Sequence, residues 1–147
     1  LQNSPQKVVR EDQPDIPRIT SLDFKVDVHS DERDVTTRYR VRHPGTNTED
    51  LRIDAFREDG SKMTLILRNG ANKGWMQEYS SDEWLQFSGS AFSKLWRTRS
   101  DKYLAYRVSS WKSMEGREYK IKTETGRGRL YDIRVNEEVP DSVFTPA

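Results

Sequence analysis

Apolar and polar residues alternate from residue 19 to residue 87 with the two-residue period that is typical of half-buried β-strands. In the first segment Leu22, Phe24, Val26 and Val28 fall on one side, and charged or polar residues fall on the other. Clusters rich in Gly, Asn, Asp and Ser, which favour turns, separate this segment from five similar ones. The pattern predicts strands at residues 22–28, 35–41, 51–55, 63–67, 75–79 and 83–87.

Short turns connect these six segments. Parallel neighbours would require a long crossover between each pair of strands, so the spacing favours antiparallel pairing in sequence order. We therefore expect the first part of the domain to be a meander of antiparallel strands.

A helical pattern follows Gly89, with Ser90 as the candidate N-cap. The stretch between Thr98 and Asp101 holds no apolar residue and is a candidate break between two helices. The apolar residues at steps of three and four are Phe92, Leu95 and Trp96, and then Leu104, Val108 and Trp111. Each of these sets shares one helix face.

The two-residue period returns after Gly116. It predicts strands at residues 119–123 and 131–135, joined by a turn at residues 126–128. The residues expected to alternate with polar ones in this hairpin are Tyr119, Ile121 and Thr123, followed by Tyr131, Ile133 and Val135.

The order of these elements predicts a mainly β fold with a helical insert, of the α+β class. We expect a curved antiparallel sheet, or open half-barrel, of about eight strands, with one or two helices covering its concave face. Residues 18–147 are long enough for one domain. Residues 1–17 hold three of the six prolines and few apolar residues, so we expect a flexible leader there.

Composition excludes several classes of function. The 25 basic and 24 acidic residues give a net charge of +1, which disfavours nucleic acid as a partner. The absence of Cys excludes disulfides, thiolate zinc sites, iron–sulfur clusters and a Cys nucleophile. No apolar run approaches the roughly 18 residues of a membrane helix. The chain begins at Leu1 without an initiating Met or a signal-like segment, so we expect a mature or trimmed chain.

The residues that could support catalysis or metal binding do not form a recognisable motif. His29 and His43 are expected on the solvent side, without the convergent carboxylate that a metal or acid–base site needs. Asp23, Asp27 and Asp54 are better explained as cross-strand charge pairs than as catalytic carboxylates. Residues 126–128 lack the following glycine and helix of a phosphate cradle, and no serine lies in a Gly-x-Ser-x-Gly elbow. We expect no enzymatic activity, metal or cofactor.

Two groups of residues are candidates for binding. The first is a basic stripe of Arg38, Arg40, Arg42 and Arg52, with Arg57 beyond it. Such a stripe would suit phosphates or anionic lipid headgroups, although a solvated outer face neutralised by acidic neighbours is its usual meaning. The second group comprises Trp75, Tyr79, Trp84, Phe87, Phe92, Leu95, Trp96, Leu104, Val108 and Trp111. These residues are expected to face inward, where they either line a ligand cavity or fill the core.

The order of elements, the helical insert and the ending Pro140-Asp141-Ser142-Val143-Phe144-Thr145-Pro146 resemble the lipoprotein carrier superfamily, which includes small exported lipoproteins. The resemblance extends over about residues 18–146. It implies an open half-barrel with a helical lid over an apolar cavity suited to acyl chains. It also implies an extracytoplasmic location, in the periplasm or cell envelope, with tethering to the membrane through a removed N-terminal segment.

Three functional hypotheses follow. The first is a non-enzymatic extracytoplasmic protein that binds a lipid, an acyl chain or a lipidated protein under the helical lid. The second is an envelope interaction domain whose cavity is filled. The third is an OB-like module that binds single-stranded nucleic acid through the arginines, which the near-zero net charge disfavours. The sequence leaves the ligand and the oligomeric state open.

Overall fold

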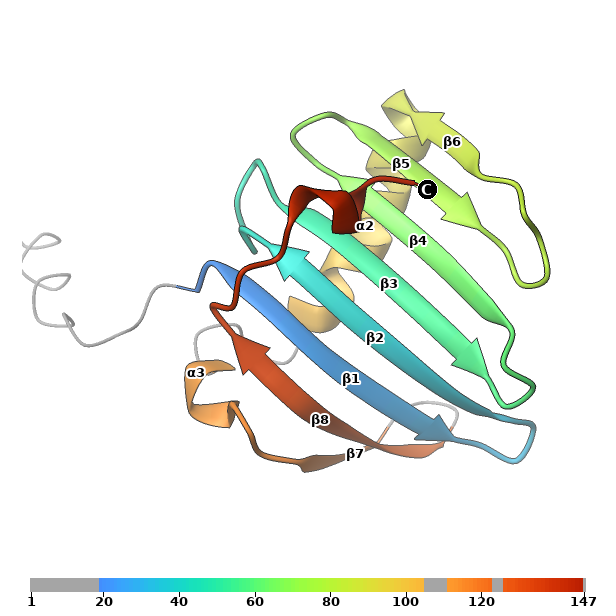
Figure 1. Ribbon diagram of the computed structural model, residues 1–147, viewed down its shortest axis with the longest axis vertical. Coiled ribbons are helices and arrows are strands. Elements are labelled where there is room, and N and C mark those ends of the chain that lie inside the picture. Colours follow the sequence, from blue (N-terminus) through green and yellow to red (C-terminus); the bar gives the residue numbers. More distant parts are fainter. Residues whose placement is uncertain (1–18, 105–110, 123–125, 147) are drawn as a thin grey trace, which may run out of the picture.

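One open, eight-stranded antiparallel sheet dominates the structure (Figure 1). This computed structural model describes residues 19–104, 111–122 and 126–146, without the side chains of residues 99–104. The strands are β1 (Ser21–His29), β2 (Asp34–Arg42), β3 (Asp50–Arg57), β4 (Lys62–Arg68), β5 (Lys73–Gln77), β6 (Leu85–Ser88), β7 (Tyr119–Lys122) and β8 (Arg127–Val135). Their order in the sheet is β6-β5-β4-β3-β2-β1-β8-β7.

The predicted meander is confirmed, because β1 to β6 pair antiparallel in sequence order. The last two strands form a hairpin, and β8 pairs with the free side of β1. The final hairpin therefore extends the sheet on the side opposite to β6. The leader expected at residues 1–17 lies outside the described residues.

In the described residues, β6 is followed by the helices α2 (Gly89–Leu104) and α3 (Trp111–Met114). The candidate break between Thr98 and Asp101 is wrong, because α2 continues through it to Leu104. Helical hydrogen bonds form within the backbone, so a turn without apolar residues does not end a helix. Residues 105–110 lie outside the described part of the chain.

The hydrophobic core lies between the sheet and the helices. Phe24 is at its centre, where its ring stacks on Tyr39 at a centroid distance of 4.9 Å and contacts Trp111 at 4.6 Å. The buried cluster comprises Leu22, Phe24, Val26, Val41, Leu51, Ile53, Leu65, Leu67, Phe92, Trp111, Leu130, Ile133 and Val135. On β1 these are the alternating apolar residues of the sequence pattern, so the predicted inward face of that strand is confirmed.

The last strand differs from its expected pattern in two ways. Residues 127 and 128 belong to β8 and not to a turn. The pairing of β8 with β1 also shifts by one residue between Tyr131 and Arg134, where Asp132 has a φ of 54°. This β-bulge places Tyr131 on the polar side, where its hydroxyl donates a hydrogen bond to Asp27, while Ile133 stays in the core.

The other face of the sheet is polar and is crossed by the C-terminal segment. This strap (residues 137–146) contains a 3-10 turn, η2 (Asp141–Phe144), that contacts β3 and β4. Figure 1 shows the strap in front of the sheet and α2 behind it. Phe144 is fully buried, and the Arg42 guanidinium lies 5.0 Å from the centroid of its ring. Both faces of the central strands are therefore covered at least in part.

Gly128 permits the close approach of β8 to β1. A Cβ atom at this position would collide with the backbone carbonyl oxygen of Asp27, and it would also press on Ile121 of β7. The collision would be with backbone atoms, and β8 has neighbouring strands on both sides. The sheet therefore has little freedom to make room for a side chain at position 128.

We expect Gly128→Ala to lower the free energy of unfolding by at least about 2 kcal/mol, because the strands would have to separate. Urea denaturation followed by tryptophan fluorescence measures the change. Gly70→Ala is the control, since a Cβ there would lie 3.6 Å from Thr48, an ordinary contact. Equal stability of the two variants would contradict this account.

Candidate functional site

The structure brings together half of the residues proposed to line a cavity. Phe92 and Trp111 are buried in the core on the helix side of the sheet. Phe87, Leu95 and Trp96 are half-buried and pack against the same core. The rings of Phe92 and Trp96 stack at a centroid distance of 5.9 Å. These five residues therefore belong to one apolar surface on the helix side of the sheet.

The edge of this apolar surface is open near β5 and β6. Phe87 lies across Gly74, where a Cβ atom would be 2.5 Å from its ring. Leu85 is paired with Met76 across the two strands, and it is 52% exposed. Met76 itself is half-buried against the core. Apolar side chains thus continue from the core toward solvent at this end of the sheet.

Three other candidate cavity residues lie elsewhere. Trp75 pairs with Ile66 and faces the polar side, where its indole N–H donates to the Gln86 side chain at 3.3 Å. Tyr79 follows β5, and the Arg57 guanidinium stacks 3.5 Å from the centroid of its ring. Trp84 is half-buried just before β6.

The side chains of Leu104 and Val108, the remaining two candidates, lie outside the described residues. Sequence periodicity gave the correct side for Phe87 but not for Trp75. The strand β5 starts at residue 73, and the alternation set by its pairing with β4 turns Trp75 away from the core.

The arginines of the basic stripe are held by aspartates. Arg38 donates two hydrogen bonds to Asp23, the shorter at 2.7 Å. Asp54 accepts bonds from Arg40 at 2.7 Å and from Arg52 at 3.0 Å. The cross-strand charge pairing expected for Asp23 and Asp54 is therefore observed.

Asp27 has the same kind of environment. Its carboxylate pairs with Arg129 at 3.1 Å and also accepts hydrogen bonds from Thr36 and Tyr131. Burial raises the pKa of Asp27, but these three donors together lower it below the ordinary value of an aspartate. Tyr131 shows the reciprocal effect, since burial and its bond to Asp27 raise the pKa of the phenol.

Asp54 is a buried carboxylate, only 2% exposed. Burial raises its pKa, but hydrogen bonds from Arg52, Thr64 and Arg40 lower it by more, so the carboxylate stays ionised. The Thr64 hydroxyl donates at 2.6 Å from β4, while the two arginines come from β2 and β3. One carboxylate thus ties three adjacent strands together.

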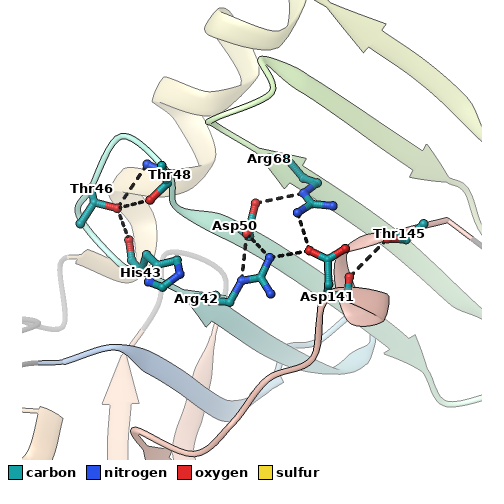
Figure 2. Close-up of polar contacts among 8 residues, drawn as sticks. All are labelled: Arg42, His43, Thr46, Thr48, Asp50, Arg68, Asp141 and Thr145. Atoms are coloured by element: carbon teal, nitrogen blue, oxygen red, sulfur yellow. Dashed lines mark hydrogen bonds and ion pairs between the residues drawn. The ribbon is translucent and has the colours of Figure 1, made fainter.

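A second charged cluster lies at the end of β2, β3 and β4 where the strap crosses the sheet (Figure 2). Buried Asp50 accepts hydrogen bonds from Arg42 at 2.7 Å and from Arg68 at 3.2 Å. On the solvent side the same two arginines donate to Asp141 of the strap, at 2.8 and 2.7 Å. We name Arg42, Asp50, Arg68 and Asp141 the strap cluster.

An open pocket of about 600 Å³ adjoins the strap cluster. Arg42, Asp50, Arg68 and Lys73 contribute its charged groups, and Trp75 contributes an indole. The remaining lining residues are His43, Thr48, Gly70 and Ala71, from the β2–β3 and β4–β5 connections. Backbone hydrogen bonds tie these two connections together, with the Asn69 N–H donating to the Glu49 carbonyl at 3.0 Å.

Both histidines are exposed. His29 is 3.1 Å from Asp34 at an exposed strand end, and His43 lies exposed in the β2–β3 connection. No group of three His, Asp or Glu residues in the described ranges is arranged to hold a metal ion. None of the helices in the described part of the chain is long and apolar enough to cross a membrane.

The sequence singled out Arg42 but not its partners Asp50, Arg68 and Asp141. Strand alternation contained a signal for two of them, because Arg42, Asp50 and Arg68 all fall on the polar side of neighbouring strands. Nothing in the local pattern indicated Asp141, which reaches Arg42 across a separation of 99 residues.

No protein-family model, curated protein or solved structure matches this chain. The functional interpretation therefore depends on the geometry of its own residues.

The lowered pKa of Asp54 predicts a pH dependence of stability. A carboxylate with a folded-state pKa below its unfolded value, about 3.9, stabilises the fold above that value, and this contribution is lost as the pH falls through the folded-state pKa. We expect Asp54→Asn to be less stable at pH 7 by about 3 kcal/mol, because Arg40 and Arg52 lose their shared anion.

Between about pH 5 and pH 2, the stability of the Asp54→Asn protein should fall less steeply than that of the unmodified chain. Urea denaturation at each pH measures both slopes. Asp31→Asn, in the exposed β1–β2 turn, is the control and should follow the unmodified protein. If the stability of all three proteins changed equally with pH, the titration of Asp54 would not be a cause of the pH dependence.

Proposed function

We propose that this chain is a non-enzymatic domain that binds an apolar or amphipathic ligand, such as an acyl chain or a lipidated partner, on the helix side of its sheet. The observation that carries this proposal is the line of partly exposed apolar side chains beside α2. Leu85, Met76, Phe87 and Trp96 lead from the core to solvent there. Continuous apolar surface of this kind is a common feature of ligand sites.

The anchoring of α2 supports a role as a lid. Within its described side chains, residues 89–98, Phe92 is the one that is fully buried, while Leu95 and Trp96 are half-buried. The start of α2 lies close to β5 and β6, and Figure 1 shows the helix continuing behind β4 and β3. Burial of the Phe92 side chain contributes about 1.5–3 kcal/mol, and the half-buried Leu95 and Trp96 add to it, so three apolar side chains hold the described start of this helix.

A second candidate function is an interaction domain with a filled interior. The stack of Tyr39, Phe24 and Trp111 favours it, because these rings already occupy the middle of the helix side. The single-stranded nucleic acid hypothesis has less support, because Arg38, Arg40, Arg42 and Arg52 each contact a carboxylate.

We further propose an extracytoplasmic, membrane-proximal site of action, in the periplasm or cell envelope. This part of the proposal rests on the resemblance of the C-terminal segment and the element order to exported lipoprotein carriers.

Native mass spectrometry of protein extracted from its host membrane separates the two functions. Co-purified lipid supports a carrier, and its absence in repeated preparations supports the filled interaction domain.

A spin-labelled fatty acid tests the location of the ligand, since a nitroxide on the acyl chain quenches nearby tryptophans. We expect the labelled fatty acid to quench tryptophan fluorescence of the unmodified protein. In Trp96→Phe the quenched fraction should be smaller. In Trp75→Phe the intensity lost on adding the fatty acid should equal that of the unmodified protein. Trp75 is the matched control because it is also half-buried but faces the opposite side of the sheet. Failure to quench, or equal effects of both substitutions, would refute binding beside α2.

A further inference from the structure

Four charged residues lie in one row across adjacent strands on the polar side. Arg42 pairs with Asp50, Asp50 with Arg68, and Arg68 with Lys73, in β2, β3, β4 and β5 respectively. Direct cross-strand neighbours have Cβ atoms about 5 Å apart, so Arg68 and Lys73 are adjacent like charges. Lys73 has no carboxylate partner among the described residues. The row therefore carries an excess of positive charge toward the β5 end.

In the strap cluster, two guanidinium groups already bind one carboxylate oxygen. The terminal NH2 groups of Arg42 and Arg68 donate to the same oxygen, Oδ1 of Asp141, at 2.8 and 2.7 Å. Buried Asp50 also accepts hydrogen bonds from both guanidinium groups, so each keeps one carboxylate partner when Asp141 is displaced. These hydrogen bonds lower the pKa of Asp141, as expected for an anion between two cations.

We propose that Arg42, Arg68 and Lys73 form a binding site for a phosphate group, and that Asp141 of the strap is an internal anion that occupies part of it. The pocket of about 600 Å³ beside the cluster has room for a phosphate and the molecule that carries it. Trp75 offers an aromatic surface in the same pocket, and Thr48 offers a hydroxyl.

Charge balance favours phosphate over a second carboxylate. The three cations and Asp50 leave a net charge of +2 in the pocket when Asp141 is displaced, from three positive charges and one negative charge. A phosphate monoester carries close to two negative charges at neutral pH and has three acceptor oxygens for the three cations. A single carboxylate such as Asp141 neutralises half of this charge.

Displacement of Asp141 need not unfold the strap. The Asp141 side chain is 64% exposed, and ion pairs of exposed groups contribute little net stability. The strap keeps other attachments to the sheet, since Phe144 is fully buried and the Val143 carbonyl accepts a hydrogen bond from Arg52 at 3.0 Å. A phosphate therefore competes with one side chain and not with the whole segment.

This site does not depend on the proposed acyl-chain function, because the two lie on opposite faces of the sheet. Glycerol 3-phosphate is the soluble probe, titrated by isothermal calorimetry at low ionic strength. We expect binding to weaken about tenfold in Lys73→Gln, the effect of one charge-assisted hydrogen bond. Asp141→Asn should bind more tightly than the unmodified chain, since the competing anion is gone. Lys62→Gln, at the other end of β4, is the control and should be unchanged.

Vesicles of phosphatidylcholine with phosphatidic acid distinguish a lipid headgroup from a soluble phosphate. Lys73-dependent binding to either probe supports the site and identifies its source of phosphate. Absence of binding to both probes, even in Asp141→Asn, would overturn the proposal. Equal losses in Lys73→Gln and Lys62→Gln would also overturn it, because they would indicate a diffuse effect of charge.

Discussion

Charge compensation between aspartates and arginines on the polar side is the constraint on which the rest of this structure depends. Asp54 and Asp50 are buried in β3, and each is bonded to arginines from more than one strand. A buried carboxylate without such partners would be strongly destabilising. A shift of β3 by one residue would also turn these carboxylates toward the core, so the network fixes the register that places Leu51 and Ile53 beneath the helices.

The strap adds Asp141 to this network and brings an apolar side chain to the polar side of the sheet. Buried Phe144 gives the sheet a second, smaller apolar contact, and the Arg42 guanidinium lies over its ring. Ile66 of β4, which faces the same side, is also fully buried. The sheet is thus covered unequally, by helices on one side and by a short segment on the other (Figure 1). The unequal cover leaves a partly exposed apolar edge on the helix side and an open charged pocket on the strap side.

Much of the fold could be predicted from the sequence, because strand alternation and short turns are local signals. All eight strands were expected, with ends displaced by a few residues. Tyr131 was assigned to the wrong face because the bulge at Asp132 is a property of the pairing with β1, which no local pattern reveals. The strap cluster was missed for a similar reason, since Asp141 reaches Arg68 only after the chain has crossed the finished sheet. The expectation that the aromatic residues face inward was correct for Phe92 and Trp111. It was wrong for Trp75, because the pairing of β5 with β4 places this residue on the polar side.

The position of β1 has a consequence for synthesis of the chain. Its first neighbour, β2, follows directly, but its second neighbour is β8, and the bond from Arg129 to Asp27 joins residues 102 positions apart. During translation, one edge of a central strand therefore stays without its partner until nearly the whole domain has left the ribosome. An unpaired edge of this kind is a template for pairing with other chains, and distant contacts slow folding. The nascent protein thus has a period of vulnerability to aggregation that ends only when the last hairpin arrives.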